Sequence, residues 1–271
     1  MKLLNNHPFH LVTNSPWPII NSMSIMSLMV GMLKWIHTMN INLLMVALVA
    51  TIITNIQWWR DITRESMFQG MHTSEVKLGL KLGMILFIIS EILFFISFFW
   101  SFFHSSLVPS HDIGAMWPPL GVSPINPSSL PLLNTMILIS SGMTITLSHY
   151  NMLSNKMKMS SNNIMITIML GLCFTSIQIY EYFQSPFTIK DNIYGSSFFM
   201  LTGFHGIHVF IGTWFMIISL MRALNNHFSK THHLNFELAA WYWHFVDVVW
   251  LFLFIFIYWW GSFPFSMNLY T

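Results

Sequence analysis

Near its C-terminus the chain reads His233-Leu-Asn-Phe-Glu237-Leu-Ala-Ala-Trp241-Tyr-Trp243-His244-Phe-Val-Asp247-Val-Val-Trp250, and residues 251–260 then carry no charge. Two carboxylates and two histidines thus accompany a stretch that is otherwise as apolar as a membrane helix. A bilayer tolerates such groups only where protein or enclosed water surrounds them. The stretch therefore predicts a membrane helix that turns a polar face toward the interior of a bundle.

The composition is that of a protein whose solvent is mostly hydrocarbon. Hydrophobic residues make up 54% of the 271 residues and charged residues 7%, with a mean hydropathy of +0.59. A soluble domain carries about 25% charged residues. The net charge of +2 comes without a basic tract, so we expect no nucleic-acid partner. The single cysteine, Cys173, excludes an internal disulfide and a multi-thiolate metal site.

Seven segments are long and apolar enough to cross a membrane, which takes a helix of about 20 residues. They are residues 16–34, 41–59, 78–103, 131–152, 162–183, 193–221 and 238–260. Lipid offers no partner for backbone N–H and C=O groups, so each segment must be helical, and the alternation typical of barrel strands is missing. The sequence predicts an all-α, polytopic membrane protein with seven transmembrane helices.

The basic residues are distributed unevenly between the two ends of these helices. With seven spans, nine of the 11 basic residues fall on the side of the N-terminus: Lys2, Arg60, Arg64, Lys77, Lys81, Lys156, Lys158, Arg222 and Lys230. Only Lys34 and Lys190 fall on the other side. The positive-inside rule therefore predicts an N-terminus on the cytoplasm-equivalent side and a C-terminus opposite. The first residues resemble neither a transit peptide nor a cleavable signal, so we expect a bacterial or organelle-made chain.

Charge also divides the chain along its length. The longest charged stretch lies between the second and third spans, which predicts a two-helix unit at 1–59, an interfacial linker at 60–77 and a five-helix bundle at 78–271. A Pro-rich loop at 104–131 contains Trp117-Pro-Pro and is expected to form an ordered cap with little helix.

Glu91 is a carboxylate well inside the third predicted span. Such a group is costly in lipid unless a cation or a hydrogen-bond donor faces it. Two interpretations remain open: an acid that exchanges protons, or a protonated acid that only bonds a neighbouring helix.

The last helix carries a second polar set. His233, Glu237 and His244 recur at offsets that place them on one helix face, and Asp247 lies about one turn beyond His244. Two further histidines, His205 and His208 in the sixth span, could face them. A di-iron or zinc site is conceivable, but the Glu-x-x-His unit of carboxylate bundles is absent, so we expect an interhelical hydrogen-bond network and no metal.

Aromatic and basic residues gather at the ends of two predicted helices, on the side of the membrane that is rich in Lys and Arg. Lipid headgroup sites require this combination. The candidate lipid-binding residues are Trp58, Trp59, Arg64, Glu65 and His72 after the second span, and Arg222 and His227 after the sixth. The alternative is that they are ordinary interfacial anchors.

A resemblance covers nearly the whole chain, from His7-Pro8-Phe9-His10 to Trp259-Trp260-Gly261-Ser262. Its motifs are Trp58-Trp-Arg-Asp61, Arg64-Glu-Ser66, Met84-Ile-Leu-Phe-Ile-Ile-Ser-Glu91, Trp117-Pro-Pro, Pro131-Leu-Leu-Asn-Thr135, Tyr194-Gly-Ser196, Gly203-Phe-His-Gly-Ile-His208 and Trp241-Tyr-Trp-His-Phe-Val-Asp247. Together they are similar to the third subunit of mitochondrial cytochrome c oxidase, in the haem-copper oxidase subunit III family.

That resemblance implies a core subunit of the respiratory complex of the mitochondrial inner membrane that passes electrons from cytochrome c to dioxygen and pumps protons. In the family, two helices splay from the other five around a V-shaped cleft that holds phospholipids. Haem a and copper belong to the first and second subunits, and the third, which stabilises the first, binds no redox cofactor. Accessory subunits are further partners. The resemblance also points to Arg64, Glu65, His72 and Arg222 as headgroup ligands, to Glu91 as a proton-related group and to a dioxygen path through the cleft.

Two other classes of membrane protein are alternatives to this one. A transporter would show an inverted repeat or paired broken helices, and the sequence has neither. The third subunit of a quinol-oxidising relative shares the fold, and the details of the Trp-Arg-Asp and Trp-Tyr-Trp-His-Phe-Val-Asp motifs favour the cytochrome c type.

Overall fold

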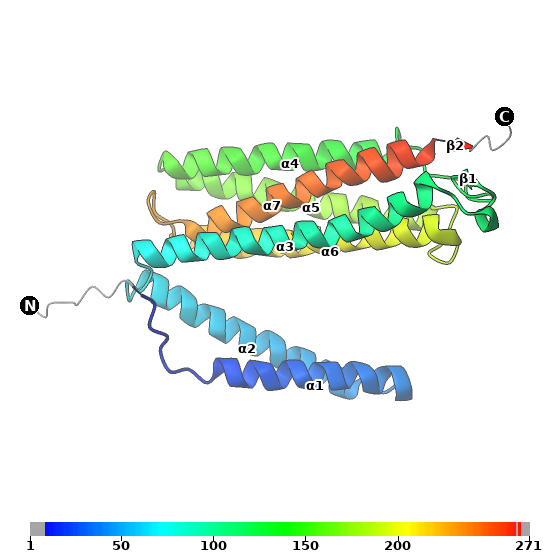
Figure 1. Cartoon of the computed structure of the whole chain (residues 1–271). Coiled ribbons are helices and arrows are strands. Elements are labelled where there is room, and N and C mark those ends of the chain that lie inside the picture. Colours follow the sequence, from blue (N-terminus) through cyan, green and yellow to red (C-terminus); the bar gives the residue numbers. More distant parts are fainter. Residues whose placement is uncertain (1–8, 264, 267–271) are drawn as a thin grey trace, which may run out of the picture. The chain divides into compact units, whose positions relative to one another are not determined.

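A computed structural model describes residues 9–263 and 265–266. Within that part of the chain, seven helices are long and apolar enough to cross a membrane, which confirms the predicted all-α architecture (Figure 1). They are α1 Trp17–Thr38, α2 Asn42–Met67, α3 Ser74–Leu107, α4 Leu130–Leu153, α5 Met157–Gln184, α6 Asn192–Leu224 and α7 Leu234–Leu253. The last helix continues as a π-helical turn, Phe254–Trp259, and a 3-10 turn, Trp260–Ser262.

The helices run beyond the apolar segments that predicted them. Helix α2 continues to Met67 and α3 begins at Ser74, so much of the charged stretch at 60–77 is helical. A helix satisfies its backbone hydrogen bonds internally, and charge outside the lipid therefore does not end it. Within this stretch the helical structure is interrupted only over residues 68–73, where Gly70 has a φ of +65°.

The chain forms two compact units, one up to Leu82 and one from Gly83 onward. The boundaries predicted from charge, at residues 59/60 and 77/78, stay a prediction, and Lys2 lies outside the described residues.

In the first unit, α1 and α2 pack against each other (Figure 1). Pro18 lies in the first turn of α1, where a missing N–H costs nothing. Buried Thr54 of α2 donates a 3.0 Å hydrogen bond to Asn21 of α1. At Gly31 the helices are so close that an added Cβ would lie 2.8 Å from the Cα of Leu44. Small and hydrogen-bonding residues thus hold this pair together, as expected between helices in lipid.

Replacing Gly31 with alanine is expected to destabilise the α1–α2 pair by about 1–3 kcal/mol, the usual cost of overpacking. The obstacle is the backbone of Leu44, so no change of side-chain rotamer can relieve it. The measurement is the temperature at which the purified complex that contains this chain loses it in detergent. The matched control is Gly79→Ala, because a Cβ there meets nothing within 4 Å. Equal behaviour of the two variants would contradict the prediction.

In the second unit, α4 packs against α5 and α7, α5 against α6, and α6 against α7 (Figure 1). Small polar residues link α4 to α5. The hydroxyls of Ser148 and Ser160 lie 2.8 Å apart, and those of Thr144 and Thr167 lie 2.7 Å apart. Each such bond contributes about 1 kcal/mol in a membrane.

Large aromatic side chains fill the centre of the second unit. Trp243 and Trp250 of α7 are fully buried, and each donates its indole N–H to α4, to Ser141 at 2.9 Å and to Thr135 at 3.0 Å. Glycines make room for the Trp243 ring, since a Cβ at Gly171 or Gly212 would lie 2.7 or 2.9 Å from it. Helix α7 is therefore fixed by ring packing and by hydrogen bonds together.

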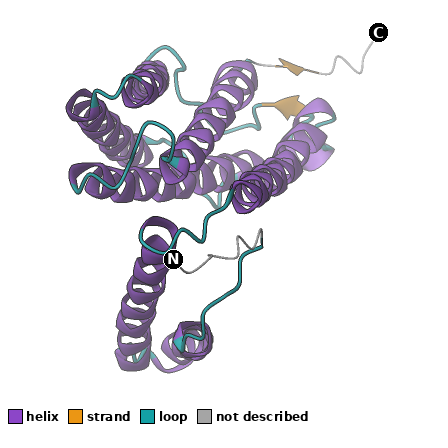
Figure 2. Ribbon diagram, turned by 90° about the vertical axis from the view of Figure 1, so that its left-hand side faces the viewer, coloured by secondary structure: helices purple, strands orange, loops and turns teal. Residues whose placement is uncertain are grey.

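The Pro-rich loop between α3 and α4 is ordered and contains little helix, as expected. It holds a 3-10 turn, His111–Ile113, and a two-residue strand β1, Met116–Trp117, that pairs antiparallel with β2, Phe265–Ser266 (Figure 2). Buried Trp117 packs against Phe102 of α3 and Tyr194 of α6, with ring centroids 5.3 and 5.5 Å away. The strand pair was not predicted, because two residues are too few to show an alternating pattern.

Candidate functional site

Glu91 of α3 and His208 of α6 form a close pair inside the second unit. The Nε2 atom of His208 lies 2.9 Å from Oε2 of Glu91, and its Nδ1 atom lies 2.6 Å from the carbonyl oxygen of Phe204. A carbonyl can only accept, so Nδ1 must carry a proton. Nε2 then either accepts from protonated Glu91 or, as part of an imidazolium, donates to the carboxylate. In both states one proton is shared and the pair is neutral overall.

Aromatic rings surround this pair. The His208 ring lies 4.9 Å from that of Phe95 and is stacked on Tyr242 at 6.3 Å, centroid to centroid. The side chain of His208 is 10% exposed and that of Glu91 23%. The pair is thus enclosed on the histidine side and open on the glutamate side, an arrangement that can hold a proton and exchange it.

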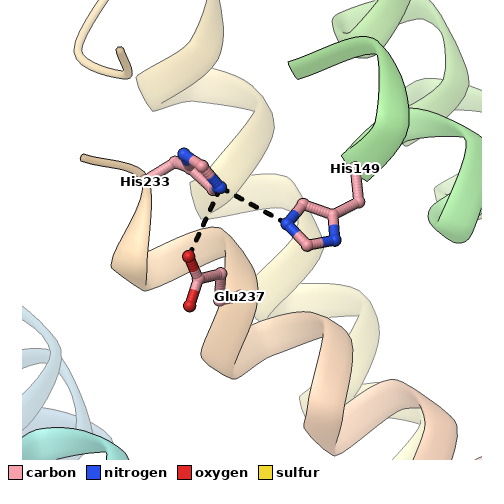
Figure 3. Close-up of side chains that lie close together, drawn as sticks. All are labelled: His149, His233 and Glu237. Carbon is pink, nitrogen blue, oxygen red and sulfur yellow. Dashed lines mark hydrogen bonds and ion pairs between the residues drawn. The ribbon is translucent and has the colours of Figure 1, made fainter. Parts of the chain in front are cut away.

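The polar residues of α7 fall into separate groups along the helix. His233, directly before α7, lies 3.3 Å from Oε1 of Glu237 and 3.3 Å from Nε2 of His149 in α4 (Figure 3). Farther along, Nδ1 of His244 lies 3.9 Å from Oδ2 of Asp247.

His205 occupies a different environment from the other predicted network residues. It is fully buried, and neither ring nitrogen has a hydrogen-bond partner among the described residues. Its ring packs against Phe174 and Trp250, with centroids 5.5 and 5.2 Å away. Among the described contacts, four of the six residues of the predicted network form two separate pairs, His233 with Glu237 and His244 with Asp247. His205 and His208 contact α7 through its aromatic rings.

The basic and aromatic candidates predicted to follow the second span lie in the first unit, in the last part of α2 and, for His72, in the loop after it. Trp58 is half-buried and Trp59 exposed, while Arg64 lies 3.9 Å from Asp61. Buried Glu65 accepts a 2.8 Å hydrogen bond from Thr13 and lies 3.7 Å from Nε2 of His10. His72 packs edge-on against His10, with ring centroids 6.3 Å apart. Glu65 thus anchors the segment before α1 against α2.

The candidates at the end of α6 lie in the second unit, with Arg222 in the last turn of the helix and His227 just after it. Arg222 is half-buried, and its guanidinium carbon lies 5.0 Å above the ring of Phe228, a cation–π contact. The Nε atom of Arg222 and the Nδ1 atom of His227 are buried, and neither has a hydrogen-bond partner among the described residues. The guanidinium as a whole is only half-buried, so its accessible N–H groups are suited to an anionic group that would accept from them.

The comparison with known proteins decides the family. The family model described as cytochrome c oxidase subunit III matches residues 7–262. The chain belongs to the cytochrome c oxidase subunit III family. It is 56% identical to cytochrome c oxidase subunit 3 of Drosophila melanogaster over 97% of this chain and all of the fly protein. The same protein of Locusta migratoria is 56% identical over 95% of this chain, and that of Mus musculus 54% over 94%, each match covering 98% of the relative.

Membership of the subunit III family confirms the resemblance seen in the sequence. The chain is a subunit of the oxidase complex of the respiratory chain, an oxidoreductase, and it assembles with other subunits of that complex. It is a multi-pass membrane protein. The transporter considered from the sequence is not the class to which it belongs.

Sequence reasoning about this subunit III chain missed two polar groups. Glu181 of α5 is 1% exposed and accepts a 2.6 Å hydrogen bond from Tyr258 and a 3.3 Å bond from Gln178. The sequence did contain a signal for Glu181, because it is a carboxylate within the predicted span at 162–183. Glu91 was singled out on the same ground within the third span. His149 carried no such signal, because it lies near the end of α4 and meets His233 only through the fold.

Proposed function

We propose that this chain is a non-redox core subunit of cytochrome c oxidase in the mitochondrial inner membrane, with its N-terminus on the matrix side and its C-terminus on the intermembrane side. In this proposal haem a and copper lie in the first and second subunits, and the chain stabilises the first. Electrons pass from cytochrome c to dioxygen there, coupled to proton pumping. The observation that carries the proposal is the family match over residues 7–262, together with the seven helices of the described residues that are long and apolar enough to span a membrane.

The chain also binds structural phospholipids in this proposal. Support comes from the end of α6, where Arg222 presents a half-buried guanidinium over the ring of Phe228 and His227 follows in the next loop. A lipid phosphate offers acceptors for the accessible N–H groups of that guanidinium, and the apolar helix surface beside it suits acyl chains. In the first unit, exposed Arg64 and the tryptophans Trp58 and Trp59 supply the same chemistry, with Glu65 and His72 holding that segment in place.

Replacing Arg222 with alanine is expected to reduce the anionic phospholipid retained by the purified complex. A charge-assisted hydrogen bond contributes about 1.5–3 kcal/mol, which corresponds to roughly 10- to 100-fold in affinity. The measurement is mass spectrometry of lipid extracted after detergent exchange, together with the rate of inactivation during turnover. Arg222→Lys keeps the charge and should retain part of the lipid.

The matched control for Arg222 is Lys230→Ala, because Lys230 is an exposed basic residue that follows the same helix. Equal lipid retention in the wild type, Arg222→Ala and Lys230→Ala would refute the lipid role of Arg222. The complex is the protein to test, since partner subunits shape the lipid environment.

The third part of the proposal concerns proton uptake. The Glu91–His208 pair supports it, because it holds one exchangeable proton and its glutamate is partly exposed. The pair gives the oxidase a proton-holding group beside the first subunit without any redox centre in this chain. A dioxygen path along the apolar helices stays a prediction of the family resemblance.

A further inference from the structure

We propose that His149, His233 and Glu237 form a binding site for a divalent transition-metal ion of the zinc type, between the end of α4 and the start of α7. Figure 3 shows the three side chains pointing toward one another from these two segments. One donor atom from each residue can be chosen so that all three lie within 4.8 Å of one another. The site shares no residue with the proton-sharing pair or with the lipid-binding candidates.

The spacing of the donor atoms fits a tetrahedral ion. Zinc binds histidine nitrogen and carboxylate oxygen at about 2.0–2.1 Å, so adjacent ligand atoms of a tetrahedron lie about 3.3 Å apart. The Nε2 atom of His233 is 3.3 Å from Nε2 of His149 and 3.3 Å from Oε1 of Glu237. Two edges of the tetrahedron are therefore already formed, and a small rotation of His149 or Glu237 closes the third.

The protonation of His233 directs a lone pair into the site. Its Nδ1 atom lies 3.0 Å from the carbonyl oxygen of Ser229, which can only accept, so Nδ1 carries the proton of the neutral ring. Nε2 then presents its lone pair toward the carboxylate of Glu237. A histidine whose other nitrogen donates to a backbone carbonyl has the orientation and tautomer typical of metal ligands. The ring is also rigidly held, since the His233 side chain is only 3% exposed.

Lone pairs from His233 and Glu237 converge, and a positive charge between them, either a proton or a metal ion, would bind to both. A charge-assisted hydrogen bond is usually about 2.7–2.9 Å long. Both contacts of His233 Nε2 measure 3.3 Å, and a single N–H could not serve two acceptors well. Ligand spacing around an ion explains both distances at once, and this favours the metal.

The donor set also selects the kind of ion. Two imidazoles and one carboxylate suit zinc, and three protein ligands leave a fourth position for water or for a group from a partner. Zinc has no redox chemistry, so the site is compatible with electron transfer in other subunits. The proposal departs from the expectation of no metal, which rested on the missing Glu-x-x-His unit and did not include His149.

The test is the zinc content of the purified oxidase complex that contains this chain. The complex is stripped with a chelator, titrated with Zn²⁺ alone, passed through gel filtration and analysed by mass spectrometry. We expect His149→Ala to bind one equivalent less than the wild type, with affinity at this site lowered roughly 100-fold or more, beyond the 10- to 100-fold typical of outer-shell changes. Zinc in partner subunits cancels in the difference.

Two further variants keep the result interpretable. Glu237→Gln is isosteric, so the fold should persist while zinc binding weakens at least tenfold. If His149→Ala does not assemble, the zinc affinity of Glu237→Gln alone tests the proposed site. His37→Ala, at an exposed histidine of α1, is the matched control and should bind as the wild type does. Equal zinc binding by the wild type, His149→Ala and Glu237→Gln would overturn the proposal and leave a shared proton at His233. Haem content verifies that each complex is intact.

Discussion

Replacing Trp243 with alanine is expected to destabilise the second unit by about 3–5 kcal/mol, the largest effect of any single substitution proposed for its core. The ring is fully buried between α4, α5 and α6, and its indole N–H donates to Ser141. In lipid, the loss is not a transfer free energy from water. It is the loss of close packing, which a bilayer cannot replace inside a bundle.

The cavity left by Trp243 could not be refilled. Two of its neighbours are Gly171 and Gly212, which have no side chains to move into the space. Sites that cannot collapse show the highest costs of truncation. Trp243→Phe should cost much less, because it keeps a ring between the glycines and loses mainly the hydrogen bond to Ser141, about 1 kcal/mol.

The measurement for Trp243 is the yield of the assembled complex and the temperature at which this chain is lost from it. The matched control is Trp259→Ala, since Trp259 is 52% exposed. If Trp243→Ala assembled and melted as Trp259→Ala does, the central role given to the Trp243 ring would be wrong.

The number and approximate place of the helices could be predicted because the bilayer imposes one physical rule on every segment. A stretch without charge must span the apolar core and must be helical there. The ends of the helices could not be predicted by the same rule. Arg60, Asp61 and Arg64 ended the predicted second span, yet α2 continues past them to Met67, because water-exposed charge is compatible with a helix.

Local spacing predicted only part of the polar contacts. The four-residue offset of His233 and Glu237 does bring them to 3.3 Å, since His233 at the N-cap of α7 lies about one turn before Glu237. Glu91 and His208 are 117 residues apart, and nothing in the local period of either helix could pair them. The contact of His149 with His233 could not be predicted from local spacing either, because it arises from the packing of α4 against α7. Contacts between helices depend on how the helices rotate and approach, and that is set by the whole core.

Glu91→Gln is expected to leave the complex assembled while slowing proton uptake, with a deficit that grows as the membrane potential rises. The amide can still donate a hydrogen bond to Nε2 of His208, so the contact that now measures 2.9 Å is kept in neutral form. What is lost is the group that accepts and releases a proton. The measurement is oxygen consumption and proton uptake by the complex in vesicles, at several membrane potentials.

A second pair of variants separates proton exchange from structure. Glu91→Leu leaves the buried Nε2 of His208 without a partner, which costs about 1–3 kcal/mol of stability. Glu91→Leu combined with His208→Leu removes both polar groups and should recover most of that stability, because no unpaired group remains. If the pair exchanges protons, the double variant stays slow in proton uptake although it is stable. Wild-type proton uptake by both the double variant and Glu91→Gln would reduce the pair to an interhelical bond, because proton uptake would then be independent of Glu91 and His208.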